Sequence, residues 1–227
     1  LLFAASVFAY ENFYSGNEKF DLKKFAGNDP SFQKQWISVD SLEKLEQSKS
    51  ALVIVNKISD AAKLLNIQPQ ILKSLIYKVK YKQTLDEGDL TNAITDFEKE
   101  ISASRFPLKP ILQSCAAELY WEYFSRNRWS FYNRTQTTQF KNYDVTTWDL
   151  QTLLNKMSSL YDASVSQEDS LKKTSVKIFD DVLTKGFMSE VYRPKLYDFL
   201  ANRALKFYMN QETELNKPAQ QFTFDIK

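Results

Sequence analysis

Apolar residues recur at every third or fourth position along most of this chain, which is the spacing of one buried face of an amphipathic helix. The clearest case lies within 106–135, where Pro107 and Pro110 fall in the first helical turn, a place that tolerates proline. Its predicted buried face consists of Leu108, Ile111, Leu112, Cys115, Ala116, Leu119, Tyr120 and Tyr123. The same pattern predicts helices over 32–47, 51–65, 72–85, 90–101, 146–161, 175–185 and 194–208, with a charged linker over 164–174.

The spacing of these helices indicates a repeat. Helix pairs are expected to begin near Phe32, Pro69 and Pro107, a recurrence of about 38 residues. Antiparallel helical hairpins that repeat every ~34–47 residues stack into solenoids. The consensus Trp, Gly and Pro positions of a tetratricopeptide (TPR) repeat are missing, so the prediction concerns architecture alone. We therefore expect an all-α, TPR-like helical-repeat domain of stacked antiparallel helical hairpins over 31–216, with Leu45 and Ile76 among its inward-facing residues.

Both ends of the chain differ from this pattern. Residues 1–9, LLFAASVFA, are apolar and end in a small-x-small triplet, which is typical of the end of a secretory signal with a mature chain beginning near Tyr10. The alternative is an ordered segment docked on the domain. Residues 10–30 are polar with interspersed aromatic residues and complete an extended N-terminal arm over 1–30. Residues 217–227, KPAQQFTFDIK, alternate like a strand and are interpreted as a linker or the start of a following β domain.

Composition narrows the class of protein. The chain is 43% hydrophobic and 15% aromatic, which is typical of a folded domain. Its 4 Gly and 6 Pro are too few for an all-β fold with frequent turns. Lys and Arg total 30 against 28 Asp and Glu, so the net charge is only +2 and we expect no nucleic-acid partner.

No catalytic motif accompanies the helices. The sequence has no histidine, which removes the commonest general base and the commonest transition-metal ligand. Its single cysteine, Cys115, is expected to pack in the core rather than to act as a nucleophile or metal ligand. The acidic residues Asp96, Glu98 and Glu100 are expected on a solvated helix face. The sequence thus predicts a protein that is not an enzyme and binds no cofactor or metal.

An aromatic–arginine segment follows the clearest helix. Its candidate partner-binding residues are Arg126, Arg128, Trp129, Tyr132 and Arg134. One interpretation is packing: Trp121, Tyr123, Phe124, Trp129 and Phe131 join the helix end to the next loop, with the arginines over rings or paired to Glu118 and Glu122. The other is a docking surface, since Trp, Tyr and Arg dominate interface hot spots. The two are compatible.

Four stretches also resemble a known family. They are ILKSLIYKVKYKQ (71–83), LQSCAAELYWEYFSRNRWSFYNRTQT (112–137), YDVTTWDLQTLLNKM (143–157) and VYRPKLYDFLANRALKFYMN (191–210). Together they resemble the N-terminal helical region of alpha-2-macroglobulin-like proteins of Bacteroidetes-type bacteria, over roughly 42–224. The NRWSFYNRT block is the most specific part.

The resemblance implies a non-catalytic scaffold in an exported protein of the periplasm or outer membrane. Its partners would be downstream macroglobulin domains of the same chain, other proteins, or proteases bound by the full-length protein. Some relatives trap proteases through a Cys-x-Glu-Gln thioester, which Cys115, followed by Ala-Ala-Glu, does not match. Trapping chemistry would therefore lie beyond Lys227. The alternatives are a stand-alone TPR-like adaptor or a helical subunit of an outer-membrane complex.

Overall fold

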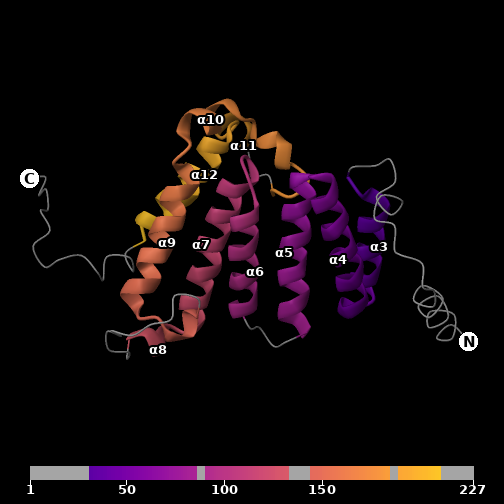
Figure 1. The fold of residues 1–227 in the computed structure, drawn as a ribbon, viewed down its shortest axis with the longest axis horizontal. Coiled ribbons are helices and arrows are strands. Elements are labelled where there is room, and N and C mark those ends of the chain that lie inside the picture. The colour runs from indigo at the N-terminus through magenta and orange to yellow at the C-terminus, as the bar shows by residue number, and fades with distance from the viewer. Residues whose placement is uncertain (1–30, 86–89, 133–143, 185–188, 211–227) are drawn as a thin grey trace, which may run out of the picture.

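The computed structural model describes residues 31–85, 90–132, 144–184 and 189–210 (Figure 1). Within these ranges all regular elements are helical, and the only β-type contact is an isolated bridge between Ser175 and Lys195. The prediction of an all-α fold is confirmed. The elements are α3 (Gln33–Lys44), α4 (Ser48–Leu65), α5 (Gln68–Leu85), α6 (Leu90–Ala103), α7 (Leu108–Arg126), α8 (Arg128–Tyr132), η1 (Val145–Thr147), α9 (Leu150–Val165), α10 (Glu168–Lys173), η2 (Val176–Phe179), α11 (Ser189–Tyr192) and α12 (Leu196–Tyr208).

The longer helices stand side by side in one row from α3 to α9, as Figure 1 shows. Helices α10 and α11 lie at the top of this view, α12 packs along α9 and α7, and α8 lies at the bottom, below α7. The closest packing joins α4 to α5, α7 to α9, α6 to α7 and α3 to α4. Helix α7 also contacts α5, α8 and α12, so it has the most neighbours among the described elements. The stretch with the clearest apolar pattern is therefore the central helix.

Small residues allow α7 to be enclosed. Ser114, Ala116 and Ala117 are all fully buried, and they let neighbouring helices approach from different sides. The large side chains Ile111 and Leu112 fill the space between these helices, and both are also fully buried. The predicted single apolar face therefore underestimates how much of this helix is covered.

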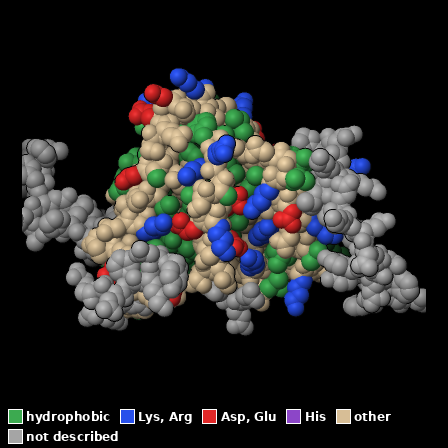
Figure 2. All heavy atoms as spheres, in the orientation of Figure 1, with side chains coloured by type: hydrophobic (Ala, Val, Ile, Leu, Met, Phe, Trp, Pro, Cys, Tyr) green, Lys and Arg blue, Asp and Glu red, His purple; other side chains and the backbone are tan. Residues whose placement is uncertain are grey.

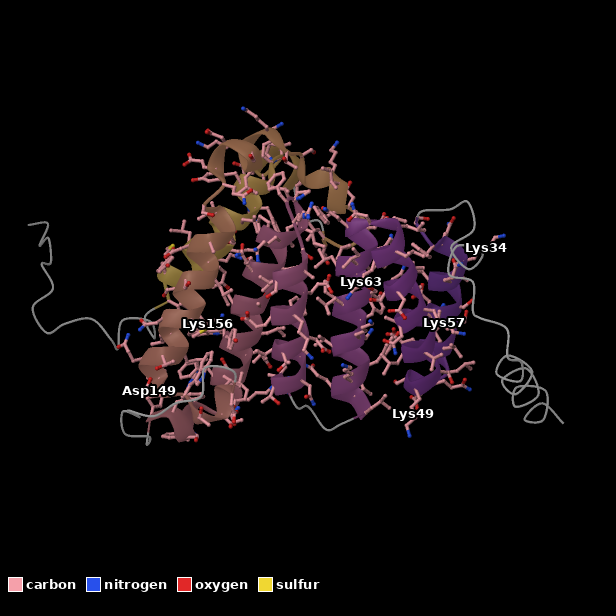
Figure 3. All side chains as sticks on the ribbon, viewed as in Figure 1. Lys34, Lys49, Lys57, Lys63, Asp149 and Lys156 are labelled. Carbon is pink, nitrogen blue, oxygen red and sulfur yellow. The ribbon has the colours of Figure 1, made fainter. Side chains whose placement is uncertain are left out.

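The expectation of a solvated acidic face on α6 is wrong for Glu100, which is buried, whereas Asp96 and Glu98 stay about one-third exposed. Glu100 is 7% exposed and pairs with Lys63 of α4 at 2.5 Å, while Asp96 pairs with Lys82 of α5 at 2.6 Å. On the other side, Glu98 pairs with Lys156 of α9 at 2.9 Å. Lys63 and Lys156 are labelled in Figure 3, where they approach α6 from opposite sides. The carboxylates tie α6 to three neighbouring helices.

Two boundaries in the C-terminal part also differ from the sequence prediction. The expected linker over 164–174 contains α10, whose buried Leu171 packs towards α12, and whose acidic first turn and basic last turn suit the helix dipole. The expected helix over 175–185 is only the short η2. The Val176 amide donates to the Pro194 carbonyl at 3.1 Å, and the Leu196 amide donates to the Thr174 carbonyl at 3.0 Å. These two hydrogen bonds join distant parts of the sequence and take the place of the hydrogen bonds of a longer helix.

The TPR-like pairing is not confirmed. The predicted hairpin of α5 with α6 has few contacts, because α5 packs mainly on α4 and α6 mainly on α7. Two residues predicted to face inward are exposed: Leu45, at the end of α3, and Ile76, in the middle of α5. Ile76 is exposed because it faces a groove between α5 and α7.

Candidate functional site

The aromatic–arginine segment begins with a sharp turn at Asn127, which ends α7. The Asn127 amide donates to the Tyr123 and Phe124 carbonyls, and its side-chain amide donates to the Tyr123 carbonyl at 2.9 Å. The Asn127 carbonyl then accepts from the amides of Ser130 and Phe131, which starts α8. One residue therefore caps the first helix and opens the second. This turn fixes the direction in which α8 leaves α7.

Helix α8 is anchored by Phe131. Its ring is 3% exposed and lies 5.9 Å from Phe124 and 6.0 Å from Tyr123, measured between ring centroids. Tyr132 meets the edge of Phe124 at 6.1 Å, and the Arg128 guanidinium carbon lies 5.7 Å from the centre of the same ring. Phe124 is thus covered by three side chains of α8. The packing interpretation is correct for these residues.

Trp129 behaves differently, because 80% of its surface is exposed to solvent. Tyr132 is 42% exposed, so its ring contacts both Phe124 and solvent. Arg126 is exposed and its Nε donates to Glu122 at 2.8 Å, one turn earlier in α7. Arg134 lies outside the described residues. The structure thus brings Trp129 and Tyr132 to the surface of a short helix with a buried anchor; we call Arg126, Arg128, Trp129 and Tyr132 the α8 surface.

A groove begins beside this surface and runs between α5 and α7. Its volume is about 740 Å³. Ile76 and Val79 of α5, Phe97 of α6 and Leu119 of α7 form an apolar floor. The rims are polar. They consist of Lys80, Gln83 and Thr84 on α5, and Glu118, Glu122 and Arg126 on α7.

Cys115 also lines this groove, whereas the sequence predicts it in the core. It is a free and partly buried cysteine. Burial raises the pKa of its thiol, so the group stays protonated at neutral pH. This environment is the opposite of the one that activates a nucleophilic cysteine.

Sequence reasoning missed the link between α7 and α12. Arg203 of α12 donates through Nε to the hydroxyl of the buried Ser114 at 2.7 Å and also pairs with Glu118. Phe207, one turn later, lies edge-on to Trp121 at 6.1 Å and stacks on Tyr161 of α9 at 4.9 Å. The partners are separated by more than forty residues in sequence. No local spacing signals such contacts.

The α8 surface and the groove both combine apolar and charged side chains. Among the described residues no group of His, Cys, Asp and Glu is placed to hold a metal ion. Basic and acidic side chains are interspersed with hydrophobic ones across the middle of the face in Figure 2. None of the described helices is both long and apolar enough to span a bilayer.

Comparison with known protein families, curated proteins and solved structures finds no match to this chain.

Proposed function

We propose that this chain is a non-catalytic protein-interaction module that docks a protein partner through the α8 surface. The exposure of Trp129 is the observation that carries the proposal. A tryptophan left 80% exposed forgoes the free energy of burying a large apolar ring. Burial against a partner recovers that free energy, and tryptophan is the residue type most enriched at interface hot spots.

The structure beneath Trp129 supports this role. Phe131, on the same short helix, is buried against Phe124, and Phe124 is itself fully buried. Arg128 and Tyr132 also contact Phe124, so α8 is held at several points. A partner would therefore meet a surface that is already ordered, which lowers the entropic cost of association.

The α8 surface is tested by removing Trp129 while keeping the fold. Trp129→Ala is compared with Tyr192→Ala, which removes a 72% exposed aromatic ring from α11 at the opposite end of the molecule (Figure 1). The partner is recovered from the source cells with the tagged wild-type chain and identified by mass spectrometry. Its affinity is then measured with each purified variant by calorimetry.

Trp129→Ala is expected to weaken binding by about 30-fold or more, the loss that defines a hot spot, with Tyr192→Ala within about twofold of the wild type. Equal effects of the two substitutions, or an affinity for Trp129→Ala equal to that of the wild type, would refute the α8 surface as the docking site.

The wider setting that we propose comes from the sequence resemblance. In it, the module belongs to an exported macroglobulin-like protein, and its partner is a downstream domain of the same chain or another envelope protein. Helices α3, α5 and α7 begin at Gln33, Gln68 and Leu108, near the expected positions, which supports a TPR-like ancestry. The weak packing of α5 on α6 counts against a regular stack of TPR-like hairpins. The mass and N-terminal sequence of the native protein test this setting.

A further inference from the structure

We infer that the groove between α5 and α7 binds an amphipathic helix of a partner protein, running antiparallel to both helices. The inference rests on the proposed interaction function and specifies the partner. A volume of about 740 Å³ with an apolar floor and polar rims suits the apolar stripe of a helix. Amphipathic helices commonly dock in this way, with anchors at every third or fourth residue.

The floor supplies the apolar half of the match. Val79 and Phe97 are buried in the core, whereas Leu119 is half-buried and Ile76 is 37% exposed. Ile76 lies in the middle of α5, where the helical pattern would otherwise place it in the interior. A partner side chain seated against Ile76 and Leu119 would complete the burial of both.

The rims supply the charged half. Lys80 lies on the α5 side, and Glu118, Glu122 and Arg126 lie on the α7 side, so the α5 rim carries one positive charge and the α7 rim, with two negative charges and one positive charge, a net charge of −1. Their present partners leave much of them accessible: the Lys80 side chain is 50% exposed, that of Glu122 is 48% exposed and that of Glu118 is 62% exposed. A helix with acidic residues along the edge facing α5 and basic residues along the edge facing α7 complements both rims.

The direction of the bound helix follows from the direction of α5 and α7. In Figure 1 the end of α5 and the start of α6 lie at the lower edge, and the end of α6 and the start of α7 lie at the upper edge, so α5 and α7 run the same way. The groove runs from the middle of both helices to their last turns, where the helix dipoles place negative partial charge. An antiparallel helix brings its positive N-terminal end to these C-termini.

Arg126 joins this groove to the α8 surface. It lines the groove and is the last residue of α7, with α8 beginning two residues later. A helix lying in the groove therefore ends close to α8. We expect one partner to use both the groove and Trp129.

The test uses two fluorescein-labelled helical probe peptides of identical composition. Each carries a stripe of leucines with Glu along one edge and Lys along the other, and the two edges are exchanged between the peptides. Fluorescence anisotropy with the full 227-residue chain measures both affinities. The peptide whose edges match the rims in the antiparallel direction is expected to bind about two- to fivefold more tightly than its counterpart, because the counterpart can match both rims only by lying parallel to α5 and α7, which brings its C-terminal end to their C-termini.

Reversing both rims should reverse this order. In the variant Lys80→Glu with Glu122→Lys, the edge-exchanged peptide is expected to become the tighter binder by a similar factor. The matched control is Lys49→Glu with Glu168→Lys, which makes the same charge changes outside the groove, on α4 and α10, and should keep the wild-type order. Ile76→Gln should weaken both peptides about tenfold, whereas Leu64→Gln, an equally polar change at an exposed leucine of α4, should weaken neither.

Equal affinities of the two peptides, no binding of either, or an order that does not change with the rims would overturn the inference. These results are separate from the test of the α8 surface. A partner weakened by Trp129→Ala but unaffected by Ile76→Gln would preserve the proposed function and remove the groove from it. If the chain discriminates between the two peptides but Trp129→Ala has no effect on the native partner, the groove would be kept as a binding site and the α8 surface would be rejected.

Discussion

The first turns of α7 and the segment from its last turn through α8 both contain several apolar side chains, yet one is enclosed and the other is half at the surface. Within Ile111–Ala117 five residues are fully buried, with other helices on several sides. Beyond Tyr123, the buried Phe124 and Phe131 alternate with exposed Arg126 and Trp129. Small and aliphatic residues thus allow other helices to pack around α7, whereas the large aromatic residues Phe124 and Phe131 form a buried support beneath the exposed residues of the α8 surface.

The largest expected effect comes from breaking the enclosed part. Leu112→Ala removes a fully buried side chain where the surrounding helices cannot all close in on the cavity. We expect the free energy of unfolding to fall by about 2–5 kcal/mol. Urea unfolding followed by circular dichroism measures this loss. A loss below about 1 kcal/mol would mean that α7 is not the centre of the core.

A smaller loss of stability is expected when the contact between Arg203 of α12 and Ser114 of α7 is removed. Arg203→Met leaves the hydroxyl of the buried Ser114 without its guanidinium donor and removes the ion pair with Glu118. We expect a loss of about 1–3 kcal/mol in the free energy of unfolding. The matched control is Arg126→Met, because Arg126 also pairs with a glutamate of α7 but is exposed; its expected loss is below about 0.5 kcal/mol. Equal losses for the two arginines would show that the bond from Arg203 to Ser114 does not stabilise the fold.

The free energy of unfolding is expected to depend on pH through Tyr161, which lies near Arg203. Burial raises the pKa of the Tyr161 phenol to about 12, against a nearby lowering contribution from Arg203. Below pH 10 the phenol is neutral in both states, so its contribution to stability is fully present. Between about pH 10 and 12 the unfolded chain loses this proton and the folded chain keeps it, so the free energy of unfolding falls. Tyr161→Phe should make this fall shallower in urea titrations, and an unchanged profile would count against it.

The smallest expected effect on stability is in the α8 surface, at the exposed Trp129. Trp129→Ala removes a ring that is 80% exposed, so the free energy of unfolding should change by no more than about 0.5 kcal/mol. Thermal and urea unfolding measure this change. A large loss would show that Trp129 is part of the fold and would leave the α8 surface without its defining residue.

Much of the fold is predictable from local pattern. The inward positions of α6, Leu90, Ala93, Ile94, Phe97 and Ile101, are all buried as expected. The all-α class follows from such spacings and from the few glycines and prolines. The pattern fails at Ile76 and Leu45, because periodicity tells which side of a helix is apolar and not whether another helix covers that side.

The site is predictable only in part for the same reason. The residue types of the segment 126–134 indicate a docking surface, and Trp129 and Tyr132 are exposed. That Phe131 would be the anchor and Trp129 the exposed ring depends on the turn at Asn127, which no residue spacing specifies. The ion pairs of Glu98 and Glu100 join α6 to different helices, and the groove exists only because α5 and α7 come together.

The contacts between α5 and α6 affect how the molecule unfolds locally. Helices α3 to α5 pack closely on one another, and so do α6, α7 and α9, but α5 meets α6 and α7 through few backbone contacts, with ion pairs such as Lys82–Asp96 across the junction. Ion pairs at this level of exposure are screened by salt, whereas apolar packing is not. The junction should therefore act as the border between two cooperative units, and native-state hydrogen exchange should report separate opening of α3–α5 and α6–α12, more readily at high ionic strength.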